Sequence, residues 1–300
     1  MFKGSIVALV TPFSDHGGLG NGLDEKSYQK LVEWQIKSGT NGIVPCGTTG
    51  ESPTLSSDEH ARVVETCIAA VKGRIPVIAG AGSNSTAEAV AYTKHAAKAG
   101  ADAVLVVTPY YNKPTNKGLY LHFKAVAESA KIPVILYNIA GRTAKNIEPE
   151  LMAKLATDCK NIVGVKEASG SLEQMMRIKE LCPKNFDLLS GDDALTLPIL
   201  AIGGTGVISV AANIVPKEIV QLIQAFENGD LKKAQNINLK LMPLIRALFL
   251  ETNPIPVKTA VSLMGYCNAS LRLPMCDMED SNLLKLKSAL KLYGIKFANA

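Results

Sequence analysis

Lys166 closes a short apolar run, NIVGVKEASG at 161–170, whose pattern is typical of a buried strand. In a strand, Ile162, Gly164 and Lys166 would point to one face, against a packed interior. Burial destabilises the ammonium form of a lysine and lowers its pKa, which frees the amine to attack a carbonyl carbon. The run therefore predicts a Schiff-base lysine. By itself it is equally compatible with a lysine that reaches water or pairs with Glu167.

Polar side chains suited to imine chemistry follow other strand-like runs: Thr48, Thr49, Tyr111, Tyr137 and Arg142. A tyrosine linked to water through a threonine can move the protons that imine chemistry requires, and an arginine offers paired N–H donors to a carboxylate. Each residue also has a structural alternative. The threonines could shape a turn, Tyr137 could be a core tyrosine, and Arg142 could be a solvated loop charge.

Other polar motifs are less specific. Asp192 and Asp193 could serve acid–base chemistry, but acidic residues are also favoured where a helix starts. The glycine-rich segment at 203–206 resembles a phosphate-binding loop, but it leads into a strand instead of a helix. The six cysteines are widely spaced and lie near no histidine cluster, so we expect neither a metal site nor a cofactor.

Short β-branched runs alternate with amphipathic segments through the first 228 residues. Eight strands are expected, at 5–10, 42–46, 76–79, 103–107, 133–137, 162–166, 186–190 and 206–210. The helices between them include 23–38, 57–71, 86–99, 117–130 and 172–181, and two of these begin at capping-box spacings, Ser56/Glu59 and Ser85/Glu88. Near-continuous apolar strands indicate a parallel sheet covered by helices, and eight repeats favour a closed (β/α)8 TIM barrel of the α/β class.

In such a barrel the C-terminal ends of the strands form one rim, where active sites lie, so the polar groups named above would meet there. Beyond about residue 228 the strand pattern stops, and helices are expected at 231–250, 256–265 and 281–293. We therefore expect a catalytic barrel domain over residues 1–228 and a C-terminal helical extension over 229–300. Nothing in the composition of the extension indicates chemistry.

With 47% hydrophobic and 20% charged residues, the 300-residue chain has the composition of an ordinary globular protein. Its formal charge of +5 is spread without a basic block, which argues against nucleic acid and membrane surfaces as partners. No apolar segment approaches the ~18 residues of a membrane span, and no targeting segment is recognised. With reduced cysteines, these features predict a cytoplasmic protein.

Six motifs occur in order along the chain: GTTGES at 47–52, VTPYYNKP at 107–114, YNIAGRT at 137–143, GVKEASG at 164–170, LSGDD at 189–193 and GGTGVIS at 203–209. Together they resemble the dihydrodipicolinate synthase family, over essentially the whole chain. The resemblance implies a (β/α)8 barrel with a C-terminal helical extension. It also implies a lyase, a homodimer or homotetramer, that condenses pyruvate with aspartate β-semialdehyde to 4-hydroxy-tetrahydrodipicolinate in diaminopimelate and lysine biosynthesis.

The resemblance implies catalytic roles for individual residues. Lys166 would form the imine with pyruvate. Tyr137 would be the acid–base residue, linked through Thr48 or Thr49, and Tyr111 would complete the relay from the neighbouring subunit of a tight dimer.

Substrate contacts are implied for a second group of residues. Arg142 would hold the carboxylate of the semialdehyde, Thr49 would contact substrate, and the backbone around Gly191 and Ile208 would line the pyruvate pocket. This chain has Ala140 where the family usually has proline, and a more flexible loop would position Arg142 less firmly.

Two other functions compete with this interpretation. N-acetylneuraminate lyases and keto-deoxy sugar acid aldolases share the fold and the imine lysine, but the sialic acid lyases usually lack the arginine after the YN pair. This chain has Arg142 together with Thr48 and Thr49. A catalytically silent barrel, kept as a binding or regulatory protein, is disfavoured by the intact Lys166 and Tyr137.

The resemblance further implies an allosteric lysine site at the dimer interface, with matching positions at Ser52, His60, Asn84, Glu88 and Tyr110. Glu88 would take an ammonium group of the effector. Alternatively, Glu88 is only the capping partner of Ser85, and His60 is a solvated helix residue. Pro53 and Ser57 stand where lysine-sensitive members often carry alanine and histidine, which weakens the match.

Overall fold

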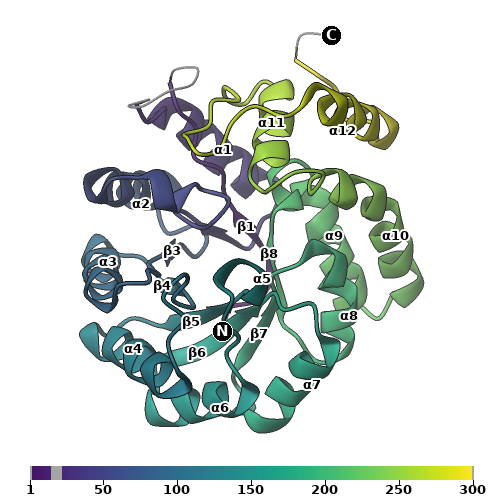
Figure 1. Ribbon diagram of the computed structural model, residues 1–300. Coiled ribbons are helices and arrows are strands. Elements are labelled where there is room, and N and C mark those ends of the chain that lie inside the picture. The colour runs from purple at the N-terminus through teal and green to yellow at the C-terminus, as the bar shows by residue number, and fades with distance from the viewer. Residues whose placement is uncertain (1, 15–21, 299–300) are drawn as a thin grey trace.

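The computed structural model describes residues 2–14 and 22–298, and its parallel strands form one sheet in the order β2-β1-β8-β7-β6-β5-β4-β3 (Figure 1). The strands are β1 (Gly4–Ala8), β2 (Gly42–Val44), β3 (Ile78–Gly80), β4 (Ala103–Val107), β5 (Val134–Asn138), β6 (Ile162–Glu167), β7 (Asp187–Ser190) and β8 (Gly206–Ser209). A parallel bridge between Ile43 and Val77 joins the two ends of this order. The predicted (β/α)8 TIM barrel is therefore confirmed.

Helices surround the strands (Figure 1). They are α1 (Glu25–Lys37), α2 (Ser57–Val71), α3 (Thr86–Ala99), α4 (Asn116–Ser129), α5 (Ala140–Thr143), α6 (Pro149–Asp158), α7 (Leu172–Leu181), α8 (Thr196–Ala201) and α9 (Pro216–Glu227). The capping box of Ser56 and Glu59 at the start of α2 is complete. At α3 only half of the expected box forms, because the Glu88 carboxylate accepts from the Ser83 hydroxyl instead of the Ser85 N–H.

The strands are buried on both faces, as predicted, and two apolar cores result. The core between strands and helices includes Val7, Val165 and Leu188, whereas the core inside the barrel includes Ile6 and Ile208. Side chains thus fill the barrel interior, and space for ligands is left at its ends.

The strand that carries Lys166 departs from simple alternation. Its register against β5 shifts by one residue at Val163, which is an extra residue on β6 and forms a bulge. Ile162 consequently packs in the outer core, while Val163 packs against the inner one. The prediction that Ile162 and Lys166 share a face was wrong. Pairing resumes beyond the bulge, where Tyr137 of β5 stands beside Lys166.

The C-terminal extension consists of α10 (Leu231–Ala247), α11 (Ile255–Leu263) and α12 (Asp280–Tyr293). Helix α10 packs on α9 of the barrel, and α12 packs on both α10 and α11 (Figure 1). The expected domain boundary at residue 228 falls between α9 and α10 and stays a prediction. Among the described residues, no helix is both long enough and apolar enough to span a membrane.

Candidate active site

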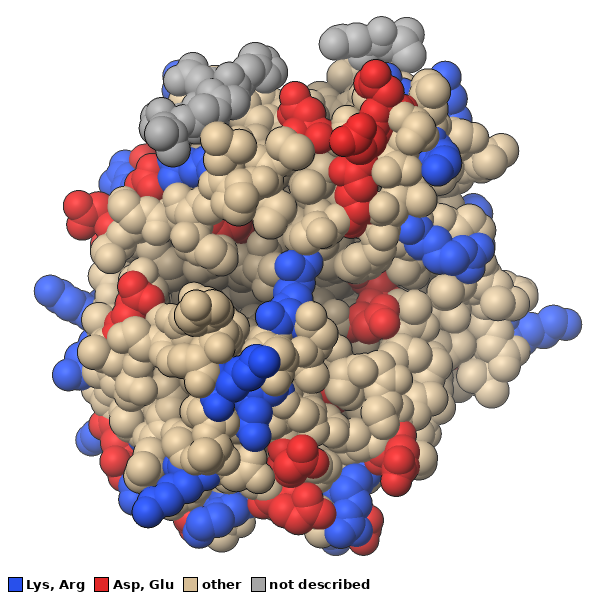
Figure 2. Space-filling view, in the orientation of Figure 1, with Lys and Arg blue, Asp and Glu red and all other residues tan. Residues whose placement is uncertain are grey.

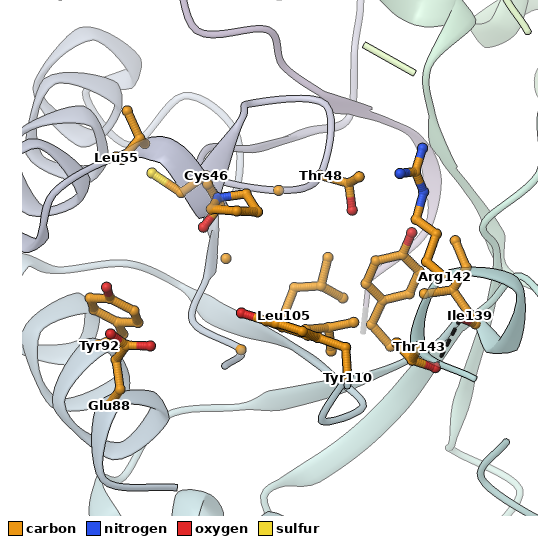
Figure 3. A pocket seen from close by; sticks show the side chains of 17 residues that line it. Cys46, Thr48, Leu55, Glu88, Tyr92, Leu105, Tyr110, Ile139, Arg142 and Thr143 are labelled. Carbon is orange, nitrogen blue, oxygen red and sulfur yellow. Dashed lines mark hydrogen bonds between the residues drawn. The ribbon is translucent and has the colours of Figure 1, made fainter. Parts of the chain in front are cut away.

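A cavity of about 310 Å³ opens at the end of the barrel where the strands have their C-termini. Its lining includes Thr48 from the loop after β2, Tyr110 from the loop after β4, Tyr137 from β5, and Arg142 from α5. Figure 3 shows Thr48 and Arg142 on one side of this space, with Glu88 and Tyr92 on the other. The rim predicted from the sequence is therefore a real cavity that collects residues from several strands.

Lys166 lies inside the barrel against Tyr137. Its side chain is only 5% exposed, and Nζ lies 4.1 Å from the centroid of the Tyr137 ring. Glu167 points the other way and accepts hydrogen bonds from the side-chain amides of Asn138 and Gln174. Lys166 is thus neither solvated nor paired with Glu167, so both alternatives to a reactive interior amine are removed.

Gly191 leaves room for the lysine. A Cβ at this position would lie 2.6 Å from Cβ of Ala168 and 3.2 Å from Cε of Lys166. The Gly191 N–H donates to the Glu167 carbonyl at 2.7 Å, which fixes the loop after β7 beside β6. Ile208 of β8 is fully buried in the inner core that also contains Tyr137.

The two adjacent threonines face different surroundings. Thr48 lines the cavity, whereas Thr49 is buried and its hydroxyl accepts a 3.0 Å hydrogen bond from Nδ2 of Asn253. Thr49, like Lys166, is not among the residues that line the cavity, and its expected contact with substrate stays a prediction. Of the two linkers considered for Tyr137, the geometry favours Thr48.

Arg142 reaches the cavity from the short helix α5, which Ala140 begins. Its backbone N–H donates to the Ile139 carbonyl at 3.0 Å, and Nη2 donates to the carbonyl of Asn253, also at 3.0 Å. The helix and the second hydrogen bond hold Arg142 in place without the proline that the resemblance led us to expect. Arg142 is exposed, but these hydrogen bonds fix it at the rim.

The tyrosine pair after β4 is split between the cavity and the outside. Tyr110 lines the cavity, while Tyr111 is 89% exposed and has a left-handed backbone conformation with φ of 69°. The neighbouring Asn112 fixes this loop, since its Nδ2 donates to the Asn84 carbonyl at 2.9 Å. Tyr111 therefore points away from the cavity of its own chain.

The residues matched to a lysine effector site are only partly brought together. Ser52, Glu88 and Tyr110 line the cavity, and His60 and Asn84 do not. His60 is buried, stacks on Tyr92 and shares a 2.8 Å hydrogen bond with the Gly80 carbonyl. The expectation that His60 could be a solvated helix residue was wrong.

Burial also lowers the pKa of the His60 imidazole to about 4, so it is neutral at pH 7. It cannot act as a cation toward an effector's carboxylate.

The acidic pair after β7 is used structurally. Asp193 is buried and accepts hydrogen bonds from the Ser209 hydroxyl and from the N–H groups of Val210 and Ala211. Burial raises the pKa of its carboxyl, and these hydrogen bonds oppose that shift. Asp192 caps the following turn. Asp193 connects the ends of β7 and β8 while Asp192 stays within its own turn, which supports the structural alternative over acid–base chemistry.

None of the sequence motifs indicated Asn253, which contacts both Thr49 and Arg142 from the C-terminal extension. The only local signal was a polar residue in front of two closely spaced prolines, Pro254 and Pro256.

In the described part of the chain, no three His, Cys, Asp or Glu side chains are grouped as a metal site. On this face of the molecule, both basic and acidic side chains lie around a hollow (Figure 2).

Comparison with known proteins identifies the family. The model of the dihydrodipicolinate synthetase family matches residues 1–293. The chain belongs to this family. A curated relative from Endomicrobium trichonymphae, named 4-hydroxy-tetrahydrodipicolinate synthase, is 60% identical over 295 residues, which are 98% of this chain and 99% of the relative.

Solved structures of dihydrodipicolinate synthases have the same fold as this chain. The Aquifex aeolicus enzyme is 48% identical, with a TM-score of 0.96 over 99% of this chain and 100% of that one. The enzyme from Cyanidioschyzon merolae, solved with lysine bound, is 44% identical, with a TM-score of 0.94 over 98% of this chain and 99% of that one. The fold and the family predicted from the six motifs are thus confirmed.

Proposed function

We propose that this chain is a 4-hydroxy-tetrahydrodipicolinate synthase, a lyase of the class I aldolase type. It condenses pyruvate with aspartate β-semialdehyde through a lysine Schiff base, in the cytoplasm, for diaminopimelate and lysine biosynthesis. The observation that carries this proposal is Lys166, a buried lysine beside Tyr137 at the catalytic end of the barrel. The 60% identity to a relative of that name supports the choice of substrates.

In the first step the amine of Lys166 adds to the ketone carbon of pyruvate. Loss of water from the resulting carbinolamine gives an iminium ion that retains the pyruvate carboxylate. Tyr137 and Thr48 line the same cavity and supply and remove the protons of this step. Gly191 has no side chain that would displace Cε of the lysine from its place beside Tyr137.

In the second step the iminium makes the pyruvate methyl group acidic, and loss of one proton gives an enamine. The enamine carbon attacks the aldehyde carbon of the semialdehyde, whose carboxylate Arg142 binds. The amino group of the semialdehyde then attacks the iminium carbon and displaces the Lys166 amine, which closes the ring and frees the enzyme. Tyr111 of a neighbouring subunit is proposed to complete the proton relay.

The decisive test is reductive trapping. Incubation with pyruvate and borohydride should add one pyruvate-derived group to the protein, and peptide mapping should locate it on Lys166. Lys166→Ala should lose both the adduct and nearly all turnover of the two substrates, with its far-UV spectrum unchanged. A label on Lys258, the other buried lysine near the site, would overturn the assignment. Efficient cleavage of N-acetylneuraminate would move the chain to the lyase branch.

A second proposal concerns inhibition by L-lysine. It is supported by Ser52, Glu88 and Tyr110, which line one part of the cavity, and by the related structure solved with lysine bound. Initial rates at fixed pyruvate should fall with millimolar L-lysine in the parent and not in Glu88→Ala. Glu65→Ala, on the adjacent helix α2, is the control and should remain inhibited. An uninhibited parent ends the proposal, and inhibition that survives Glu88→Ala places the effector elsewhere.

A further inference from the structure

Asn253 joins two parts of the rim that are far apart in sequence. Its Nδ2 donates to Oγ1 of Thr49 in the loop after β2, and its main-chain carbonyl accepts from Nη2 of Arg142, both at 3.0 Å. Asn253 itself is only 6% exposed and belongs to the extension beyond the barrel. One residue of the extension therefore fixes the distance between the threonine loop and the arginine.

The same loop is held at its other end by a buried ion pair. Nζ of Lys258, in α11, lies 2.6 Å from Oε1 of Glu51, and neither side chain is more than 2% exposed. The backbone N–H of Arg272 donates to the second carboxylate oxygen at 3.1 Å. Glu51 follows Thr49 by two residues, so the extension holds this loop at two closely spaced positions. The α11 segment is consequently held in place, and Asn253, which precedes it, has a fixed position.

The orientation of Thr48 depends on these attachments. Glycines at 47 and 50 flank the threonine pair, and glycine allows many backbone conformations. The hydrogen bond from Asn253 turns the Thr49 side chain into the protein, which leaves the Thr48 side chain facing the cavity. Without that bond, the turn is free to rotate the Thr48 hydroxyl away from Tyr137.

We propose that Asn253 is a positioning residue for the condensation, acting through Thr49 on Thr48 while its carbonyl holds Arg142. The inference rests on the proposed function. It assigns a role in the reaction to the C-terminal extension, which the sequence left without one. Asn253 is not among the residues that line the cavity, and it acts through its hydrogen bonds with Thr49 and Arg142.

Asn253→Ala tests the proposal because it removes the amide donor and keeps the carbonyl that Arg142 uses. We expect kcat for the condensation to fall about tenfold, the effect of losing one orienting hydrogen bond, with trapping of pyruvate on Lys166 retained. Thr49→Val, which removes the acceptor at nearly constant volume, should give the same loss, and Thr49→Ser should restore activity. Asn268→Ala, which removes a half-buried asparagine of the extension that donates to the Ser14 carbonyl, is the control and should keep the parent kcat.

The effect must also depend on Thr48. In a Thr48→Val background, Asn253→Ala should cause no further loss of kcat, whereas a merely structural role would lower kcat in both backgrounds. Full kcat in Asn253→Ala, or additive losses in the double variant, would overturn the inference. If Asn253→Ala does not fold, Thr49→Val alone and combined with Thr48→Val decides the question. A parent that fails to condense the two substrates refutes the proposed function instead.

Discussion

Two buried lysines lie near the barrel rim, and their surroundings suit one to a structural role and the other to catalysis. Lys258 is paired with Glu51 and stays fixed; burial lowers the pKa of its amine and the carboxylate opposes that shift. Lys166 contacts the face of Tyr137, and within the described residues it has no carboxylate in ion-pair range. An amine without a counter-ion, beside a phenol that lines the cavity, is the one suited to attack a carbonyl.

Gly191→Ala should slow imine formation by Lys166. The added Cβ would meet the Ala168 Cβ at 2.6 Å and the Lys166 Cε at 3.2 Å, so the lysine must move from its position beside Tyr137. We expect the rate of pyruvate trapping to fall at least about tenfold, since small misplacements of a reacting group are costly. Gly141→Ala, where a Cβ would meet nothing within 4 Å, is the matched control. Equal trapping by both variants would contradict this role of Gly191.

Arg142→Ala should impair the reaction with the semialdehyde far more than imine formation with pyruvate. Loss of one charged partner of a carboxylate costs about 2 to 5 kcal/mol, so kcat/KM for the semialdehyde should fall by one to several orders of magnitude. Trapping of pyruvate on Lys166 should stay within about twofold of the parent. Arg142→Lys keeps the charge without the paired donors and should be intermediate. If imine formation and semialdehyde turnover fall together, Arg142 is structural.

At the scale of elements, local patterns predicted most of the barrel. The bounds of α2, α3, β4 and α7 agree with those expected, because caps and apolar periodicity lie within each segment. The bulge at Val163 was missed because it depends on the register with the neighbouring strand. Asn253 was missed because it bonds Thr49 across 204 positions, a contact that no local pattern encodes.

The ion pair between α11 and the loop after β2 should contribute strongly to stability. Lys258→Met leaves the buried Glu51 carboxylate without its cation, which should lower the free energy of unfolding by about 3 to 5 kcal/mol. Lys154→Met removes the solvated partner of Asp158 and should cost less than about 1 kcal/mol. Urea unfolding of the two variants and the parent measures the difference. Similar losses of unfolding free energy in both variants would show that the buried pair stabilises the fold no more than a solvated pair does.

At the scale of the whole molecule, the loop after β4 is the observation that supports the proposed dimer. Tyr111 is 89% exposed on a left-handed backbone that non-glycine residues rarely adopt, and its neighbour Asn112 is hydrogen-bonded to Asn84. Tyr111 points outward from a hydrogen-bonded loop, next to Tyr110 in the cavity lining. This position suits insertion of Tyr111 into a second copy of the chain related by twofold symmetry. The proposed dimer therefore places Tyr111 in the partner's site.

Mixing two inactive variants tests this exchange directly. Tyr111→Phe should keep the assembly but lower kcat about 10²-fold or more, since it removes only the hydroxyl of the proton relay. Lys166→Ala is inactive for a different reason and retains Tyr111. If Tyr111 acts across the interface, hybrid dimers of the two contain one intact site, built from the lysine of one chain and the tyrosine of the other.

Refolding an equal mixture of these variants should therefore restore about a quarter of the parent activity, because half of the dimers are hybrids and each has one of two sites. Leu292→Ala, which truncates an equally exposed apolar residue on α12, is the control for assembly and should sediment like the parent. No recovery on mixing would place Tyr111 in the site of its own chain or outside the reaction. A parent that is fully active while sedimenting as a monomer would contradict the shared site outright.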